Sequence, residues 1–518
     1  MKYYNACIYD RNNNLVRNSV IDVKDGRISD IYVCADIIPD EGDYNCNGLV
    51  IVPSFMDSAV TLPGKDVFKL FGLDLSNCNT LDGYLQRISA TTAVDGIRGY
   101  GLNTFVVGED GATRIKKLMD TMMPDKPCYI YFDDMTNVIV NKYILEEAKK
   151  YIIVDKDTTV DGMLDTYQIS TLKKLTTLFD FTQDELQLAL LSFQNTLLEK
   201  GITSIRVLDT FGGRSTLNAV QALTVSGDWK IETVMYVPCY PFDTMEEIWE
   251  RCNLYKEIEC ENINVIGITL TLDGSIDSGQ AALIQPYDVD KEWYGDIIWN
   301  RSKLRSVIRE YMPKGWDINI NAYGDRAVSF ATDSLCGSKS YWGTGKKIIT
   351  HAYLMNDVDI QMCRENDIIL CIEPNAVPYH NTFYEGDSIM IGDRTYLQYP
   401  VGRLMYAGVK VIAGSNLPVQ PEISPIDGIY KACHRGGADD VTPYQMMLSY
   451  GLHAYMLFDI ADDYGALAIG KKATFLLVDK DIVNMREDLI ANCQCVATIA
   501  DGDMLWVDEK RMTNWEHK

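Results

Sequence analysis

The 518-residue sequence predicts an α/β protein: a (β/α)8 TIM-like barrel, a small β-sandwich domain built from both termini, and an α/β insertion after the first barrel strand. Three observations lead to this prediction. Short β-rich runs occupy both ends of the chain, strands and helices alternate through its middle, and one long segment separates the first two of these strands.

The two ends of the chain have the same character. Residues 3–9 near the N-terminus and residues 474–478 near the C-terminus are short apolar runs rich in β-forming residues, with turn signals around them. We therefore expect residues 1–50 and 466–518 to form one composite β-sandwich domain, and residues 51–465 to form the barrel.

Helix and strand signals alternate through the middle of the chain. Thr182 and Glu185 form a capping box ahead of a helix over residues 183–200, and Gly201 ends it before the next strand. Eight strands are expected, at residues 51–57, 202–208, 231–237, 263–272, 317–323, 347–352, 368–373 and 409–413. Functional side chains of such a barrel lie at the C-terminal ends of its strands.

The first two barrel strands are separated by residues 62–181. This segment is far too long for one crossover connection. We expect it to be an inserted α/β subdomain that covers the mouth of the barrel.

Composition limits the class of partner. Lys and Arg number 48 against 73 Asp and Glu, a formal charge of −25 that disfavours binding to nucleic acid and to anionic membranes. The 14 cysteines contain no CxxC pair, as expected for reduced thiols in a cytoplasmic protein. No signal peptide and no apolar run long enough to cross a bilayer is apparent.

Motifs at the strand ends resemble those of a known family. Residues 52–62, VPSFMDSAVTL, are similar to the first-strand motif V-P-G-F-I-D-x-H-x-H-L of the amidohydrolase superfamily. The segments TLDGS (271–275), NAYGDRA (321–327), ITHA (349–352) and AGSNLPV (413–419) resemble L-D-G-S, H-A-x-G-D-x-A, I-E-H-A and G-S-D-x-P-V of amidohydrolase family 3, which includes N-substituted formamide deformylase. The resemblance runs in order along essentially the whole chain.

The resemblance implies hydrolysis of non-peptide C–N bonds by water activated on one or two divalent metals. The positions that match the family's metal ligands here hold neutral side chains: Ala59, Thr61, Thr269, Asn321 and Asn416. Only the sixth-strand His351 remains. Because such ions require imidazole or carboxylate ligands, we expect no metal and no other cofactor.

One alternative metal site stays open. Asp57, His351 and Glu373 are all expected at the barrel mouth, where together they would form a mononuclear site. The remaining histidines give no support to a metal site, because no two of the five histidines have HxH or HxxxH spacing.

The polar replacements predict a wet pocket that has kept its shape. In it we expect His351 to act as general base or acid, with Glu373 or Asp325 orienting it. The expected substrate-binding residues are polar side chains at or near the strand ends: Asp57, Thr61, Thr269, Asp273, Asn321 and Asn416. The two amides among them, Asn321 and Asn416, are candidates to stabilise an oxyanion.

Two functions fit these residues. The first is a divergent, metal-independent hydrolase, lyase or isomerase that acts on a C–N bond of a small polar molecule. The second is a catalytically silent homologue that binds a small ligand or a partner subunit. The resemblance also suggests a homodimer. Purely structural roles are open as well: His351 as a satisfied barrel residue, Asp325 as a helix cap, which is favoured over catalysis, and Asp273 as a turn residue.

Overall fold

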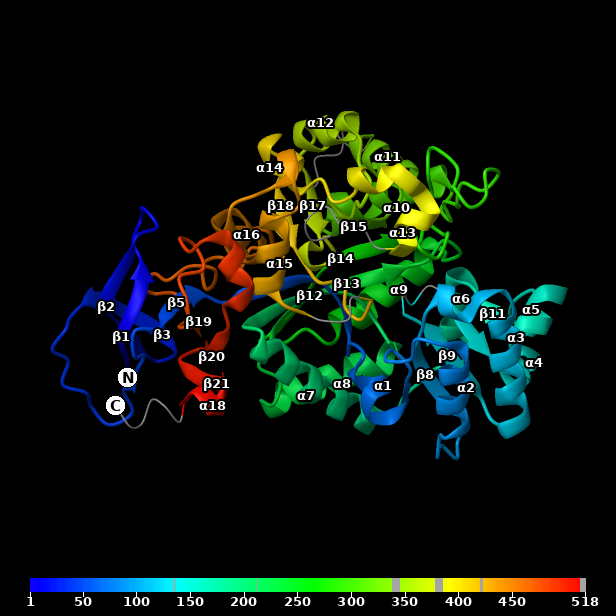
Figure 1. Ribbon diagram of the computed structural model, residues 1–518, viewed down its shortest axis with the longest axis horizontal. Coiled ribbons are helices and arrows are strands. Elements are labelled where there is room, and N and C mark those ends of the chain that lie inside the picture. The colour runs from blue at the N-terminus through cyan, green and yellow to red at the C-terminus, as the bar shows by residue number, and fades with distance from the viewer. Residues whose placement is uncertain are drawn as a thin grey trace.

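The computed structural model describes residues 1–133, 135, 137–211, 213–337, 345–377, 385–419 and 423–512. Its elements form three regions (Figure 1). The two ends of the chain meet in a β-sheet domain at one end of the long axis, the barrel lies in the middle, and the inserted subdomain lies at the other end.

The barrel contains eight parallel strands, each of which pairs with the next. They are β6 (Phe55–Leu62), β12 (Ile202–Thr210), β13 (Glu232–Cys239), β14 (Ile263–Thr271), β15 (Asp317–Ala322), β16 (Lys347–His351), β17 (Ile368–Ile372) and β18 (Val411–Ala413). Backbone hydrogen bonds close the ring: Thr61 N–H donates to Leu417 O at 2.9 Å, and Asn416 N–H donates to Ala59 O at 2.9 Å. The predicted TIM-like barrel is thus confirmed.

The first predicted strand is in fact two strands. β5 (Val50–Pro53) belongs to the terminal sheet, where it lies antiparallel to β19 (Phe475–Val478), and the barrel strand β6 begins only at Phe55. Pro53 has no N–H to donate, so sheet pairing ends naturally beside it. The apolar run that continues from one strand to the other conceals this boundary in the sequence.

Helices cover the outside of the barrel (Figure 1). The predicted capping box opens α7 (Gln183–Glu199): Glu185 N–H donates to Thr182 Oγ1 at 3.3 Å, and Thr182 N–H donates to Glu185 Oε2 at 2.8 Å. The other barrel helices are α8 (Gly213–Ser226), α9 (Met245–Lys256), α10 (Arg301–Tyr311), α11 (Asp325–Cys336), α12 (Asp357–Glu365), α14 (Val401–Tyr406), α15 (Pro425–Cys433), α16 (Pro443–Tyr450) and α17 (Leu452–Leu457).

Both ends of the chain contribute to one domain, as expected, but its strands are connected in a single sheet and not in the two sheets of a sandwich. Its remaining strands are β1 (Lys2–Tyr9), β2 (Leu15–Lys24), β3 (Arg27–Val33), β4 (Tyr44–Asn45), β20 (Cys495–Ala500) and β21 (Asp503–Val507). Tyr3, Ile21, Phe475 and Ile499 are buried in a hydrophobic cluster that this sheet has to itself. One side of the sheet therefore has its own core, while other residues of the same strands, such as Val52 and Leu476, belong to the main cluster that includes the barrel.

The inserted subdomain has a sheet of its own. Its strands are β7 (Leu73–Asp74), β8 (Ile97–Leu102), β9 (Cys128–Phe132), β10 (Val138–Val140) and β11 (Met163–Leu164). The helices of this segment are α1 (Asp66–Phe71), α2 (Leu81–Ser89), α3 (Thr104–Met122), α4 (Lys142–Ala148), α5 (Lys156–Asp161) and α6 (Thr166–Leu175).

Specific contacts fix the inserted subdomain to the barrel. Tyr100 Oη donates to Pro418 O at 2.9 Å, just beyond β18. Arg98 forms an ion pair with Glu185 at 2.6 Å, and both side chains are partly buried. These contacts hold the subdomain beside the mouth of the barrel.

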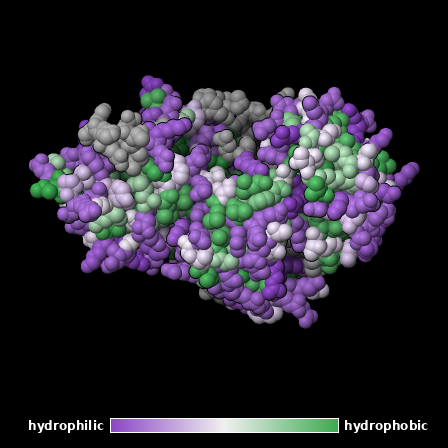
Figure 2. Space-filling model, turned by 90° about the horizontal axis from the view of Figure 1, so that it is seen from below, coloured by the Kyte–Doolittle hydropathy of each residue, from purple (hydrophilic) through white to green (hydrophobic). Residues whose placement is uncertain are grey.

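The surface is largely hydrophilic on the face that Figure 2 shows. Hydrophobic side chains form small groups between the hydrophilic ones. All 14 cysteines are free thiols. Within the described ranges, no helix is long and apolar enough to cross a membrane.

Candidate functional site

The centre of the candidate site is a pair of buried side chains on neighbouring strands. His351 is the last residue of β16, and Glu373 directly follows β17. His351 Nδ1 lies 3.0 Å from Glu373 Oε1, and the two residues are only 3% and 1% exposed. The contact is too poorly aligned to count as a hydrogen bond, and neither Glu373 oxygen has a hydrogen-bond partner within the described part of the chain. A buried carboxylate is costly unless a positive group or hydrogen-bond donors compensate it.

The backbone at these strand ends is also unusual. His351, Ala352 and Asn416 have φ angles of +80°, +46° and +57°. Non-glycine residues in this region cost roughly 1–3 kcal/mol each, and such residues concentrate at functional sites. Two of the three are predicted site residues, which makes the strand ends of β16 and β18 the strongest candidates for function.

Two tyrosines cover His351. The Tyr323 ring stacks on the imidazole with ring centres 3.9 Å apart and planes inclined by 14°. Tyr353 meets the imidazole edge-on, with ring centres 5.9 Å apart. The Tyr323 hydroxyl accepts a long hydrogen bond from Asn416 Nδ2 at 3.5 Å. The stacked ring therefore closes the imidazole off from one side.

We expect Tyr323→Ala to expose His351. In the native protein, diethylpyrocarbonate should modify the exposed His453 and leave His351 almost unreacted, because reagents reach a buried group only through local opening. In the variant, His351 should react about an order of magnitude faster, as measured by peptide mass spectrometry. Tyr406→Ala, which changes an exposed tyrosine elsewhere, is the matched control. Equal reactivity of His351 and His453 in the native protein would contradict the stacked arrangement.

Amides and hydroxyls form a hydrogen-bonded layer inside the barrel. Asn319 Nδ2 donates to Thr269 Oγ1 and to Asn321 Oδ1, both at 2.9 Å. Asn321 Nδ2 donates to Thr271 Oγ1 at 3.1 Å. Thr269 is buried, whereas Thr61, Asn321 and Asn416 keep partial exposure. Hydrogen bonds through Asn319 therefore connect Thr269 with Asn321. The side chains of Thr61, Asn321 and Asn416 remain partly accessible to solvent.

A buried arginine anchors this layer. Arg206, on β12, is 0% exposed and donates to Ser58 O, to Asn319 Oδ1 at 3.0 Å and to Thr350 Oγ1 at 2.9 Å. Arg206 was not among the predicted site residues, although a single charged residue in the apolar strand run ITSIRVL was a signal. Arginine is almost never fully buried without partners, so its position in that run indicates an interior polar network.

Asp57 lies at the junction between β6 and the loop after β18. Its Oδ1 accepts N–H groups from Ala59 at 3.1 Å and Ser415 at 2.8 Å, while Oδ2 has no partner among the described residues. Burial raises the pKa of Asp57 to about 6, and the charge of Glu373 acts in the same direction. Asp57 is therefore a second buried carboxylate near the pair.

This pKa predicts a pH-dependent stability. The folded protein binds the Asp57 proton more tightly than the unfolded chain, so the contribution of this proton to stability falls as pH rises from about 4 through about 6. The full difference between a folded pKa of about 6 and the ordinary carboxyl pKa near 4 corresponds to about 3 kcal/mol. Asp57→Asn keeps an acceptor oxygen and removes the charge. In urea unfolding at pH values near 4.5 and 7.5, the free energy of unfolding should fall by about 2 kcal/mol less in the variant than in the native protein, because part of the effect is already lost at pH 4.5. The exposed Asp82→Asn serves as control, and an unchanged pH dependence in Asp57→Asn would contradict the buried charge.

Two predicted aspartates hold loops. Asp273 Oδ1 accepts Tyr323 N–H at 2.8 Å, and its Oδ2 accepts two further backbone N–H groups. Asp325, in the first turn of α11, accepts the N–H groups of Ile284 and Arg326 at 2.8 and 2.9 Å. Glu373, and not Asp325, is therefore the carboxylate beside His351. Burial raises the pKa of Asp273 to about 7.

A cavity of about 990 Å³ lies between the barrel and the inserted subdomain. Tyr323 and Tyr353 line it on the barrel side, and Tyr84, Tyr100 and Asp133 line it on the subdomain side. None of the predicted site residues is among its described lining residues. The tyrosines thus stand between the cavity and His351.

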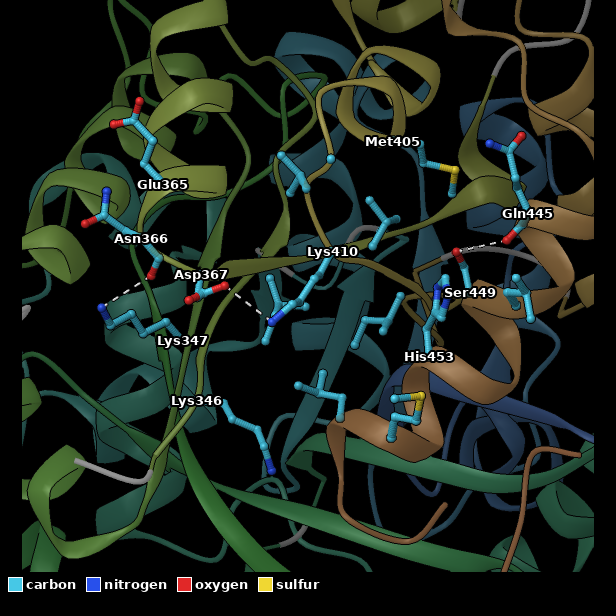
Figure 3. A pocket seen from close by; sticks show the side chains of 18 of the residues that line it. Lys346, Lys347, Glu365, Asn366, Asp367, Met405, Lys410, Gln445, Ser449 and His453 are labelled. Carbon is cyan, nitrogen blue, oxygen red and sulfur yellow. Dashed lines mark hydrogen bonds and ion pairs between the residues drawn. The ribbon is translucent and has the colours of Figure 1, made fainter. Parts of the chain in front are cut away.

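A second cavity, of about 870 Å³, lies at the opposite end of the barrel strands (Figure 3). Lys346, Lys347 and Lys410 line it, and the lysines already have partners. Lys410 Nζ is 3.4 Å from Asp367 (Figure 3). Lys346 Nζ is 2.5 Å from Asp459. This face of a barrel supports stability rather than catalysis, so we assign the functional site to the first cavity and the strand ends beneath it.

A metal ion in a hydrolase needs several imidazole or carboxylate ligands grouped around one point. Among the residues that the structure describes, no three or more His, Cys, Asp or Glu side chains are grouped so that they can hold a metal ion. Asp57, His351 and Glu373 do not form such a group. Two of the five histidines, His380 and His517, lie outside the described residues.

Comparison with known proteins finds amidohydrolases and structures described as metal-dependent hydrolases. The family model described as "Amidohydrolase family" matches residues 44–505. "Putative amidohydrolase YtcJ" of Bacillus subtilis (strain 168) is 23% identical over 419 residues, which cover 77% of this chain and 75% of that protein. Two solved structures described as uncharacterized metal-dependent hydrolases are similar in fold. The one from Pyrococcus horikoshii OT3 has a TM-score of 0.72 at 20% identity, covering 94% of this chain and 99% of its own. The one from Pyrococcus furiosus has a TM-score of 0.70 at 19% identity, covering 93% and 99%.

Proposed function

This chain belongs to the amidohydrolase family, and on that premise we propose that it hydrolyses a C–N bond of a small polar molecule without a metal ion. The observation that carries the proposal is the buried pair of His351 and Glu373, 3.0 Å apart at the ends of neighbouring strands. An imidazole beside a carboxylate is the arrangement that general bases use in hydrolysis.

The donor set supports the metal-free part of the proposal. Structural relatives are described as metal-dependent, but within the described part of this chain Asp57, His351 and Glu373 are not grouped as the ligands of one ion. Ala59, Thr61, Asn321 and Asn416 offer only methyl, hydroxyl and amide groups, and divalent ions in hydrolases are held by imidazole and carboxylate.

In the proposed reaction, His351 removes a proton from water as the water oxygen attacks the carbonyl carbon. The Glu373 carboxylate stabilises the imidazolium that forms. Amide N–H groups of Asn321 and Asn416 stabilise the negative oxygen of the tetrahedral intermediate. His351 then returns the proton to the leaving nitrogen, so that the C–N bond breaks and a carboxylic acid and an amine are released. The Tyr323 ring has to move aside for substrate to reach the imidazole.

An amide-hydrolysis assay after removal of metals tests this function. Protein dialysed against EDTA is incubated with formanilide, acetanilide, N-acetyl amino acids and hydantoin, and the released amine or acid is quantified. Turnover should persist in EDTA and should not rise when Zn²⁺ or Mn²⁺ is added. Turnover that appears only with added metal would overturn the metal-free proposal.

A second function is favoured by one observation. His351 is only 3% exposed and lies beneath the Tyr323 ring, as expected of a homologue that binds a small ligand in the cavity and does not turn it over. Binding of a compound in calorimetry without any product would support this alternative against hydrolysis. A cytoplasmic location and a homodimer remain predictions from the sequence.

A further inference from the structure

We infer that the cavity above His351 selects organic cations, so that the substrate carries an ammonium, amidinium or quaternary nitrogen group beside the bond that is cleaved. The inference deepens the proposed function and rests on it for the location of the chemistry. It stands on the charges and the aromatic rings that line the cavity.

Carboxylates from three separate parts of the chain converge on this cavity. Asp133 follows β9 of the inserted subdomain, Asp277 lies in the loop after β14, and Asp387 lies in α13 (Glu385–Ile391). Because these segments are far apart in sequence, the fold alone brings the three acids to one space. The potential in that space favours a positive ligand over a neutral or negative one.

The lysines of the cavity leave this balance negative. Its described charged residues are six acids and three lysines: Asp66, Asp74, Asp133, Asp277, Asp387, Glu199, Lys65, Lys69 and Lys200. Lys200 is already paired with Glu199 at 2.8 Å. The net charge of the whole chain, −25, has the same sign as that of the cavity.

Asp387 is the most informative of these acids. It is 6% exposed, and Gln398 Nε2 donates to its Oδ2 at 2.7 Å. Within the described part of the chain it has no ion-pair partner, and the groups that face it, Asp277 and Tyr287, are acidic or neutral. Burial raises the pKa of Asp387 to about 7, and the charge of Asp277 adds to this. A bound cation supplies the missing positive charge.

Aromatic rings supply a second means of cation recognition. Tyr84, Tyr100, Tyr323, Tyr353 and Tyr399 all line the cavity. Tyr353 packs against Tyr399 and Tyr323 with ring centres 4.7 and 5.3 Å apart, so the three rings form a continuous wall. The faces of such rings attract ammonium and quaternary groups by about 0.5–2 kcal/mol each.

Three acetanilides of nearly the same shape test the inference. They carry a para trimethylammonium, tert-butyl or carboxylate group, and the first two are isosteric. Isothermal titration calorimetry with the full chain should give the trimethylammonium compound an affinity at least about tenfold above that of the tert-butyl compound, with the carboxylate weakest. Equal or stronger binding of the tert-butyl or carboxylate compound would overturn the inference.

Two substitutions test whether the acids of the cavity cause the preference for the cationic compound. Asp387→Asn and Asp277→Asn should each reduce the affinity for the cation by about tenfold and leave the tert-butyl compound unchanged. Asp82→Asn changes the net charge equally but lies on an exposed surface, so it should leave the preference intact. If both cavity variants still bind the trimethylammonium compound more tightly than the tert-butyl compound by the same factor, the inference is wrong. Two variants are used so that misfolding of one, checked by its melting curve, does not decide the result.

Binding and turnover are measured separately, so the preference for cations and the proposed hydrolysis can each fail without the other. Selective binding of the cation without any product would support the inference and contradict hydrolysis. Hydrolysis of the three compounds with equal kcat/KM would support hydrolysis and contradict the inference.

Discussion

Arg206→Ala is expected to destabilise the protein by about 4 kcal/mol, the largest effect of any single substitution considered for its fold. The guanidinium is fully buried, and three strands depend on it through Ser58 O, Asn319 Oδ1 and Thr350 Oγ1. Removing one partner from a buried, charged network costs about 3–5 kcal/mol, because the remaining polar groups lose their donors. The truncated side chain also leaves a cavity.

Urea unfolding followed by circular dichroism measures this effect. Arg114→Ala is the matched control, because Arg114 is half-exposed and pairs with an exposed Asp82. Such surface pairs contribute less than about 1 kcal/mol. If Arg206→Ala unfolds within about 1 kcal/mol of the native protein, the polar layer does not depend on the arginine, and its assignment as the anchor is wrong.

His351→Ala is expected to reduce kcat/KM for a hydrolysed amide by at least about 100-fold. Proton transfer by a positioned side chain contributes about 10²–10⁴-fold to a hydrolysis, and within the described residues no second imidazole is in contact with Glu373. Glu373→Gln keeps the shape of its side chain and removes the charge. It should reduce kcat by about tenfold or more and leave KM nearly unchanged, because the charge acts mainly on the imidazolium formed during reaction.

His453→Ala is the control for these measurements. His453 is exposed and lines the second cavity, at the opposite end of the barrel strands (Figure 3). The kcat/KM of His453→Ala should therefore equal that of the native protein. Unchanged turnover in His351→Ala, with normal folding, would contradict a catalytic imidazole. Loss of turnover together with an unchanged melting temperature would exclude a purely structural role for His351.

Much of the fold could be predicted because its signals are local. The capping box at Thr182 opens α7 as expected, and each barrel strand appears within a few residues of its predicted range. The boundary at Ser54 could not be predicted, since β5 and β6 form one apolar run in the sequence and separate only by their partners. Strand pairing is a long-range property that local patterns do not contain.

The candidate site was less predictable. Strand-end positions placed His351 and Glu373 together, because parallel barrel strands end at one face. The stacking of Tyr323 on His351 and the anchoring of Asn319 by Arg206 depend on side-chain directions across several strands. Asp273 and Asp325 were predicted as site residues, but their carboxylates accept backbone N–H groups and hold loops. Polar residues that follow strands also have this structural role.

Metal content is the most direct test of the central claim that this amidohydrolase works without a metal ion. The chain is purified without a metal-affinity tag and analysed by elemental mass spectrometry, alongside an assay of the same sample. We expect far less than one equivalent of Zn, Mn, Fe or Ni per chain, and turnover that does not depend on the residual metal. One or more equivalents, lost together with activity on chelation, would contradict the account and would mean that Asp57, His351 and Glu373, or other residues, hold a metal.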